Sequence, residues 1–494
     1  MKRFKPILSV FILLFVITAT PAAAQEIDPP GSLTPSSDLV TESSNTFEYS
    51  SSEGVNKKEA LTEGTALSAD RVVKPASDII NISISPYVNE KSPDIAHGGD
   101  YYMVVYEEEY ETEDSITTRV FSNSGDLMYT YYVQTCPKNY CEYPAIAYDA
   151  KSGYFLVAYG YLFSGSDWDI YVEAVSPTEG VLKEGFSMAA TSTGDERIPS
   201  IACNHDDGSC LVAYQTNAAL SSPIMGRFLE IDIEGQDITF LGAPYALTDA
   251  TIGLEPKLAW GRDSDTYMVT YRSEAPGGQF SSMYTHVHDQ PVNSGDQYLH
   301  GNTYVVSPGY FGDDHNISNN DVAYDPCTQR YVVTFGYDYY GDNSDYDIYA
   351  VAKHSTEGSG LAPFPIVNSP HYTNHSRISF VTDDDLTPSC GSMDRLVFTY
   401  YNDTLGIMAG ELRGNNNPST PAYEGDSVFE HLLIHPHLPG QNKRVSSQEI
   451  SSGSMLGELF IVFEYYDTNI PYEFNVKGKI VTIMEKNFLP LIIK

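Results

Sequence analysis

The chain has 494 residues, with 28 Lys and Arg against 66 Asp and Glu, and a formal net charge of −38. Hydrophobic residues make up 41%, which is enough to bury a large core and excludes a chain that is disordered throughout. A nucleic-acid-binding protein is also excluded, because phosphate recognition requires a basic face.

Residues 1–24 have the three parts of a secretory signal peptide. Three basic residues precede residue 6, Ile7–Ala19 is an apolar stretch of 13 residues, and Ala22–Ala24 supply small residues for cleavage. The apolar stretch is too short to span a bilayer comfortably, and no later segment is long and apolar enough. We therefore expect a secreted protein, extracellular or on the cell surface, without a membrane span.

Residues 25–77 are rich in Ser, Thr, Glu, Pro and Gly and poor in aromatic residues. This composition is typical of a disordered spacer. A repeat begins after it, and the clearest copy starts at Pro144 with Pro-Ala-Ile-Ala-Tyr-Asp. The equivalent position of each copy, the repeat anchor, is occupied by Pro93, Pro144, Pro199, Pro256, Asn320, Ser376 and Gln448.

Three columns of the repeat match in all seven copies. Two positions after each anchor lies an aliphatic residue, as in Ile146, and the next residue is small, as in Ala147. The second predicted strand ends in an aromatic residue each time: Tyr106, Tyr159, Tyr214, Tyr271, Phe335, Tyr400 and Phe463. Each copy contains four short segments rich in Tyr, Val and Ile between turn residues, which predicts four β-strands.

A repeated four-stranded unit predicts an all-β protein, a β-propeller with seven blades over residues 78–485. The seventh copy lacks a fourth strand, whereas Ile79–Ile84 precedes the first copy as an unpaired strand. We predict that this N-terminal strand completes the last blade, since pairing would hide two exposed sheet edges. An open array or two smaller domains is the alternative. The apolar tail 486–494 is either a processing or attachment signal or a packed edge segment.

The even cysteine count predicts disulfides in an exported chain. Cys136 and Cys141 flank a short loop, and Cys203 and Cys210 lie across one predicted hairpin. We expect each of these two pairs to form a bridge. The remaining pair, Cys327 and Cys390, falls in equivalent turns of consecutive copies. A bridge between blades is therefore expected there. For the six cysteines together, a zinc site is the alternative to disulfides.

Two copies carry the pattern Asp-aromatic-Asp-Ile-Tyr, with carboxylates that share one face of a strand. Such oxygen ligands suit Ca²⁺, although capping of the preceding loop is the competing interpretation. No cofactor is required by the sequence. The candidate calcium ligands are Asp167, Asp169, Asp338, Asp342, Asp345 and Asp347.

Other polar groups point more weakly to chemistry. The acidic runs 107–109 and 383–385 are interpreted as solvated loops. His286 and His288 alternate on a predicted strand, as do His435 and His437 with His431 nearby, but no third ligand at a telling spacing follows. No catalytic motif is found, and the catalytic residues stay unknown.

The repeat Pro-x-Ile-Ala-Tyr-Asp, Tyr-Phe-Leu-Val-Ala-Tyr, Asp-x-Asp-Ile-Tyr resembles that of exported bacterial β-propeller proteins, which are mostly uncharacterised. The resemblance covers residues 79–482 and implies the fold without a catalytic set. Glu196–Pro199 also resembles the Arg-Ile-Pro motif of sialidases, but the Asp-box pattern of that family is missing around Trp168.

Propellers serve both as binding modules and as enzymes, and the fold does not choose between them. We expect a monomeric binding or interaction module for an extracellular glycan or protein ligand. The alternative is a carbohydrate-active enzyme, a glycoside hydrolase or polysaccharide lyase, with funnel carboxylates as acid and base.

Overall fold

The computed structural model describes residues 71–75, 79–83, 88–165, 167–182, 186–187, 195–216, 222–234, 237–248, 253–275, 279–288, 304–305, 316–338, 345–354, 363–368, 372–381, 395–412, 432–436, 443–452, 458–467 and 474–485. All of them belong to the compact unit Leu61–Lys494, which is separate from the unit Met1–Ala60. The predicted signal peptide, most of the predicted spacer and the tail 486–494 lie outside the described residues.

The described residues form antiparallel β-sheets and no helix, in agreement with the all-β prediction. We number the sheets 1 to 7 in chain order, and each begins at one copy of the sequence repeat. Sheet 1 contains β3 (Asn89–Gly98), β4 (Tyr101–Glu109), β5 (Glu113–Ser122) and β6 (Leu127–Pro137). Sheet 2 contains β7 (Cys141–Asp149), β8 (Tyr154–Ser164), β9 (Asp167–Ser176), β10 (Gly180–Val181) and β11 (Phe186–Ser187).

The next four sheets have four strands each, hydrogen-bonded in chain order. Sheet 3 contains β12 (Glu196–Cys203), β13 (Cys210–Thr216), β14 (Ile224–Asp232) and β15 (Asp237–Ala246). Sheet 4 contains β16 (Gly253–Gly261), β17 (Thr266–Ala275), β18 (Gln279–His288) and β19 (Tyr304–Val305). Sheet 5 contains β20 (Ile317–Asp325), β21 (Arg330–Asp338), β22 (Tyr346–His354) and β23 (Phe364–Val367). Sheet 6 contains β24 (Thr373–Val381), β25 (Arg395–Asn402), β26 (Gly406–Leu412) and β27 (Leu432–Pro436).

Sheet 7 combines both ends of the described chain. Its C-terminal strands are β28 (Lys443–Ser452), β29 (Glu458–Asp467) and β30 (Phe474–Glu485). The outer edge of β30 pairs with β1 (Arg71–Pro75) and with β2 (Ile80–Asn81). The predicted pairing of the segment 79–84 is thus present at Ile80 and Asn81. The strand β1 lies within the range 25–77 that the sequence assigns to the spacer.

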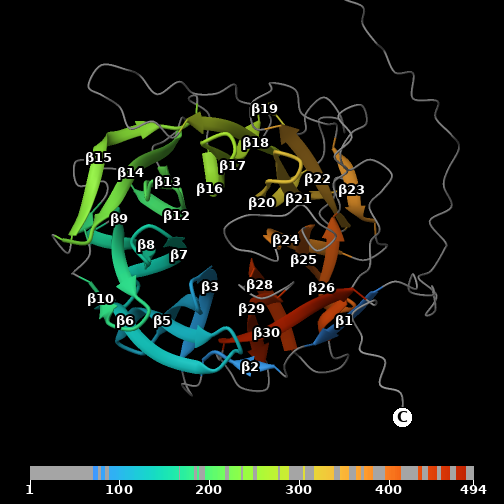
Figure 1. The fold of residues 1–494 in the computed structure, drawn as a ribbon, viewed down its shortest axis with the longest axis horizontal. Helices are drawn as coiled ribbons and strands as arrows, with labels where there is room; N and C mark the ends of the chain where they lie inside the picture. Colours follow the sequence, from blue (N-terminus) through green and yellow to red (C-terminus); the bar gives the residue numbers. More distant parts are fainter. Residues whose placement is uncertain are drawn as a thin grey trace, which may run out of the picture. The chain divides into compact units, whose positions relative to one another are not determined.

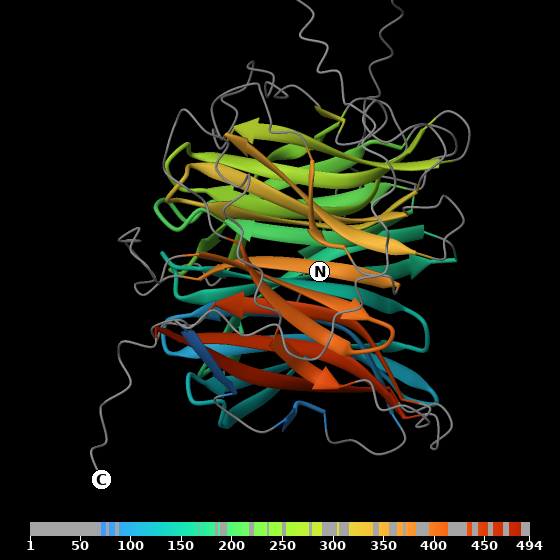
Figure 2. The same cartoon turned by 90° about the vertical axis from the view of Figure 1, so that its right-hand side faces the viewer.

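The sheets are arranged in chain order around a central axis, with the first strand of each sheet nearest to it (Figure 1). In the side view the strands cross between the two faces of this arrangement (Figure 2). Four-stranded antiparallel sheets placed face to face around an axis are the architecture of a β-propeller. No helix among the described residues is long and apolar enough to cross a membrane.

The core lies between neighbouring sheets rather than inside any one of them. The aromatic residue that was expected to end each second strand lies inside that strand, and it is buried in all seven copies with at most 3% of its surface exposed. One cluster joins Tyr102 and Tyr106 of sheet 1 to Phe460 and Val462 of sheet 7. Burying one such aromatic side chain contributes about 1.5–3 kcal/mol. The aromatic column of the sequence therefore holds the sheets together.

Candidate functional site

A β-bulge interrupts the first strand of every sheet at the repeat anchor. The register between first and second strands shifts between Lys91 and Asp94 in sheet 1, and at the equivalent place in the other six sheets. A bulge adds one residue to its strand and bends it locally. The additional residue, one position before the anchor, is called the bulge residue below.

Six bulge residues have a positive φ although none is glycine. The angles lie between 44° and 56°, in the left-handed region that costs an L-residue about 1–2 kcal/mol. Ile198 is the least tolerant of them, because its Cβ is branched. The six residues are Ser92, Tyr143, Ile198, Glu255, Asn319 and His375. The strained bulge is therefore a feature that the fold repeats in six sheets.

The six bulge residues line one cavity of about 410 Å³, which also borders Asp94, Lys257, Arg377 and Glu464. Their strands are the ones that surround the central axis (Figure 1). The backbone geometry repeats, whereas the side chains differ from sheet to sheet. A repeated scaffold that presents different side chains to one cavity is the arrangement expected of a binding site.

The residue two positions after the bulge residue has a structural role in three sheets. Its side-chain oxygen accepts a hydrogen bond from a backbone N–H of the next sheet. We call it the latch position. The pairs are Asp94 with Ile146 at 2.9 Å, Ser200 with Leu258 at 3.1 Å, and Asp321 with Ile378 at 2.8 Å.

The carboxylates of the cavity wall are engaged by the scaffold. The two oxygens of Asp94 accept the backbone N–H groups of Ile95 and Ile146. Glu464 Oε1 accepts the backbone N–H of Ser92 at 2.7 Å, which joins sheet 7 to sheet 1. Glu255 Oε1 pairs with Arg272 Nη2 at 2.5 Å. These carboxylates thus hold the backbone and side chains of the cavity wall in place.

Basic groups enter the wall from sheets 4 and 6. Lys257 and Arg377 occupy the latch position there, and Arg377 donates a hydrogen bond from Nη1 to the carbonyl of Ser376 at 2.9 Å. Burial, together with the charge of Arg377, lowers the pKa of His375 to about 4. The His375 side chain is therefore neutral at physiological pH.

Acidic side chains gather beside Tyr143 at the junction of sheets 1 and 2. Burial raises the pKa of Glu107 to about 8, and the nearby carboxylates of Glu109, Asp114 and Glu142 act in the same direction. Burial also raises the pKa of Tyr143, with Glu142 and Glu107 as further causes. Glu107 is therefore largely protonated at neutral pH.

The prediction of a loop for residues 107–109 is wrong, because all three belong to β4. The prediction of solvation is wrong for the first two, since Glu107 is 7% exposed and Glu108 is 2% exposed. Glu108 Oε2 accepts hydrogen bonds from Tyr110, Ser115 and Thr117. Because these hydroxyls come from the neighbouring strand and the turn before it, tertiary structure rather than composition decides the burial. The run 383–385 lies outside the described residues.

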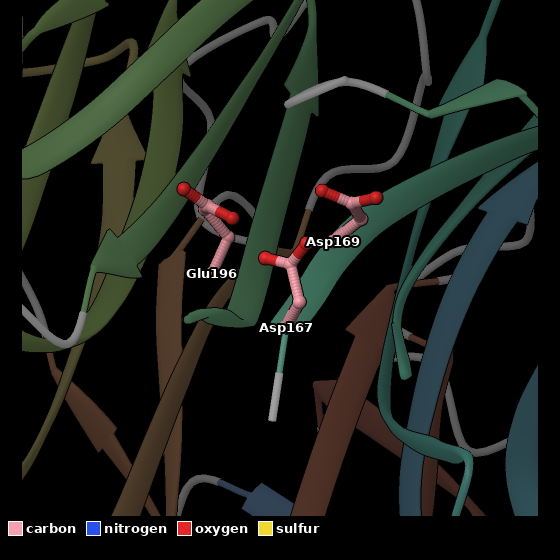
Figure 3. Close-up of side chains that lie close together, drawn as sticks. All are labelled: Asp167, Asp169 and Glu196. Atoms are coloured by element: carbon pink, nitrogen blue, oxygen red, sulfur yellow. The ribbon is translucent and has the colours of Figure 1, made fainter. Parts of the chain in front are cut away.

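Three carboxylates converge between sheets 2 and 3 (Figure 3). Asp167 and Asp169 lie on β9, and Glu196 begins β12, with one oxygen of each within 4.8 Å of the others. Asp169 and Glu196 are buried, and Oδ1 of Asp167 is a buried oxygen that receives no hydrogen bond. Among the residues that the structure describes, no other three acidic, histidine or cysteine side chains meet so closely.

Successive side chains of a strand point to opposite faces, and this alternation decides which of these residues meet. Asp167 and Asp169 point to one side of β9, whereas Trp168 points to the other and carries the guanidinium of Arg197 4.3 Å from its ring centroid. Arg197 Nη1 also lies 3.3 Å from Glu142 Oε1. The predicted Asp167–Asp169 pair thus acquires a third carboxylate, Glu196, from the next sheet.

The equivalent pair in sheet 5 lacks such a third carboxylate. Asp345, Asp347 and Asp338 are all buried, but the residue equivalent to Glu196 is Thr373, whose hydroxyl donates to the carbonyl of Tyr346. Asp342 lies outside the described residues. The two copies of the sequence pattern therefore occupy different surroundings.

Two of the predicted disulfides are present, Cys136–Cys141 and Cys203–Cys210. Cys327 is disulfide-bonded, and Cys390, its predicted partner, lies outside the described residues. His286 and His288 lie on β18 and His435 on β27, but their side chains are outside the described part, as are residues 431 and 437.

Sequence reasoning missed the residues that line the cavity. Tyr143, Lys257 and Arg377 immediately precede or follow their anchors, so the repeat alignment contains their positions. Only the bulge, which turns these positions toward the axis, identifies them as the wall of one site. Glu196 was missed because it lies one sheet away from its partners.

No protein-family model matches this sequence, and no curated protein matches it. Among solved structures, a Trypanosoma rangeli sialidase in complex with the inhibitor DANA is 10% identical, with a TM-score of 0.40 over 83% of this chain and 59% of the sialidase. A Penicillium chrysogenum α-L-arabinanase complexed with arabinobiose is 13% identical, with a TM-score of 0.41 over 70% and 95% of the two chains. The β-propeller domain of the Trilobed protease from Pyrococcus furiosus is 9% identical, with a TM-score of 0.41 over 80% and 94%. No activity transfers from structures this distant.

Proposed function

We propose that this protein is an extracellular binding module, a seven-bladed β-propeller that holds a glycan or protein ligand in its central cavity. In this proposal the N-terminal strands complete the last blade and close the ring. The observation that carries the function is the cavity wall, where six strained bulges present six different side chains.

The state of the cavity carboxylates favours binding over hydrolysis. A hydrolase needs an acid and a base that face the substrate and exchange protons. Asp94, Glu255 and Glu464 instead hold backbone N–H groups or Arg272. A wall fixed in this way is suited to recognise a ligand without transforming it.

A glycoside hydrolase or polysaccharide lyase is the second candidate, because Glu107 does not line the cavity itself but lies near enough for its charge to raise the pKa of the lining residue Tyr143. Burial keeps its carboxyl group protonated near neutral pH, which is what a general acid requires. This candidate predicts release of reducing sugar from a bound glycan. Loss of that release in Glu107→Gln, with binding retained, would identify the enzyme.

Tyrosine substitutions test the binding proposal. Tyr143 lines the cavity and is 41% exposed, whereas Tyr132 is 62% exposed and lies outside the cavity lining. On a glycan array, Tyr143→Ala is expected to weaken binding about tenfold, because an aromatic face that stacks on a ligand is removed. Tyr132→Ala is the matched control and should bind like the wild type. Equal loss in both variants would place the ligand elsewhere.

We propose calcium binding at one place, the junction of sheets 2 and 3. Asp167 and Asp169 with Glu196 offer three hard oxygen ligands, the donor type that Ca²⁺ prefers. We propose that an ion there would connect sheets 2 and 3. Export through residues 1–24, tethering by the part of residues 25–77 that precedes β1, and a monomeric state are likewise proposed from the sequence.

A further inference from the structure

We propose that the central cavity recognises the carboxylate of an acidic sugar, with Lys257 and Arg377 as its cationic contacts. This inference rests on the proposed binding function and names the ligand class. Both residues line the cavity, and both come from the latch position, in sheets 4 and 6.

The residues at the latch position of the other sheets show how Lys257 and Arg377 differ. In sheets 1, 3 and 5 it holds Asp94, Ser200 and Asp321, whose oxygens accept a backbone N–H of the next sheet. Lysine and arginine have only donors and cannot accept that hydrogen bond. Sheets 4 and 6 therefore give up the structural contact and place a positive charge at the cavity instead.

Charge is divided across the cavity. The acidic wall comes from Asp94 of sheet 1 and Glu464 of sheet 7, and their oxygens hold backbone N–H groups. The basic wall comes from sheets 4 and 6, and Glu255 beside it is paired with Arg272. The two cations of the lining thus lie on one side of the cavity, which would orient an asymmetric anionic ligand.

The groups between the two cations are neutral and polar. Asn319 of sheet 5 lines the cavity between sheets 4 and 6, and His375 is uncharged at physiological pH because its pKa is lowered to about 4. Arg377 is 8% exposed and is held by its hydrogen bond to Ser376. A guanidinium fixed before binding loses little freedom when it meets a carboxylate.

The remainder of the wall suits a sugar ring. A volume of about 410 Å³ lies in the range of small-molecule sites. Tyr143 and Ile198 add apolar surface, and Ser92 and Asn319 add hydrogen-bonding groups. A ring with hydroxyl groups and one carboxylate matches this combination of apolar, polar and cationic surface.

The first experiment compares acidic oligosaccharides with their neutral parents. Galacturonan and galactan fragments, and glucuronan and glucan fragments, are presented to the wild-type protein on one array. Binding confined to the acidic members is expected. Equal or stronger binding to the neutral members would overturn this inference and leave the proposed function standing. Binding to no member would also overturn this inference, and binding to no other glycan would remove the glycan ligand from the proposed function and leave only a protein ligand.

The second experiment removes the cation. Lys257→Met should weaken binding of the best acidic oligosaccharide about tenfold or more in calorimetry, because a charge-assisted hydrogen bond is lost. Lys257→Arg keeps the charge and should retain most of the affinity. Arg262→Met is the matched control, since Arg262 lies outside the cavity lining and pairs with Asp206 at 3.9 Å. Wild-type affinity in Lys257→Met, with an unchanged melting temperature, would refute the assignment.

Discussion

At the scale of single residues, the strained bulge is the feature on which the site depends. Tyr143 has φ 53° and Ile198 has φ 51°, values that glycine would adopt without cost. The chain nevertheless carries large side chains there. Since these side chains line the cavity, the strain is associated with the site rather than with the core.

Glycine substitution separates strain from packing. Tyr132→Gly, in a strand without positive φ, should lower the free energy of unfolding by about 1 kcal/mol. Tyr143→Gly should lower it by about 1 kcal/mol less, because the left-handed backbone is relieved. Chemical denaturation of both variants measures the difference. Equal destabilisation would show that Tyr143 is not strained.

Glu107 makes stability depend on pH. Its pKa is about 8 in the folded protein and near 4.5 when unfolded, so the folded state holds a proton that the unfolded state releases between these values. Stability from this group therefore falls as pH rises from 4.5 through 8. Glu107→Gln should be close to the wild type at pH 5 and exceed its free energy of unfolding by about 4 kcal/mol at pH 8.5, since each unit of pKa shift corresponds to about 1.4 kcal/mol.

Glu109 is the control for that pH effect, because hydrogen bonds from Lys91 and Asn89 lower its pKa. A group with a lowered pKa contributes stability above its unfolded pKa and loses it on acidification. Glu109→Gln should therefore destabilise at neutral pH, opposite in sign to Glu107→Gln. The same sign in both would contradict the assignment.

At the scale of elements, neighbouring sheets are joined by buried aromatics and by the latch hydrogen bonds. The aromatics supply most of the free energy, since dispersion and burial scale with area. The latch hydrogen bond fixes how two neighbouring sheets are aligned, because one side-chain oxygen accepts one backbone N–H across the boundary.

Removing a latch hydrogen bond should lower the free energy of unfolding. Asp321→Ala leaves the backbone N–H of Ile378 without its acceptor and should lower the free energy of unfolding by about 1–3 kcal/mol. Asp321→Asn keeps an acceptor oxygen and should lose less. Thermal melts of the two variants provide the comparison, and equal losses would assign the effect to charge instead.

The junction of sheets 2 and 3 is where calcium should act. If the cluster of Asp167, Asp169 and Glu196 binds Ca²⁺, an ion at about 100 times its Kd should stabilise the protein by about 2.7 kcal/mol relative to EDTA. Asp169→Asn should abolish this shift, whereas Asp347→Asn, the sheet 5 equivalent, should leave it intact. An unchanged melting temperature in calcium and EDTA would return these aspartates to a structural role.

At the scale of the whole molecule, the first and the last strands that the structure describes meet in one sheet. Ile82 is fully buried in the cluster that joins sheet 1 to sheet 7, and its N–H donates to the carbonyl of Val476 at 3.1 Å. A segment near residue 80 and a strand near residue 480 therefore stabilise each other.

Ile82→Ala tests that connection. Loss of a fully buried isoleucine should lower the free energy of unfolding by about 2–5 kcal/mol and expose the last sheet to proteolysis. Ile233→Ala, at a side chain that is 49% exposed, should have almost no effect. A small loss in both variants would mean that sheet 7 is stable without the N-terminal segment.

The sequence alone determined that most copies of the repeat form a sheet of four strands, and it also determined two disulfides. It could do so because strand periodicity, the aromatic column and short loops are local properties that recur along the chain. The sequence also predicted the pairing of the segment that contains Ile80 with the last sheet. An unpaired strand precedes the first copy of the repeat, and the last copy lacks its fourth strand.

Only the tertiary structure decided which residues share a site. The bulge brings Tyr143, Lys257 and Arg377 from three sheets to one cavity, and no pattern within one sheet contains that relation. Likewise, Glu196 joins Asp167 and Asp169 because neighbouring sheets meet, while the next sheet presents Thr373 rather than a carboxylate to the sheet 5 pair. Strand patterns are set by neighbours in sequence, whereas a cavity is set by contacts among residues more than a hundred positions apart.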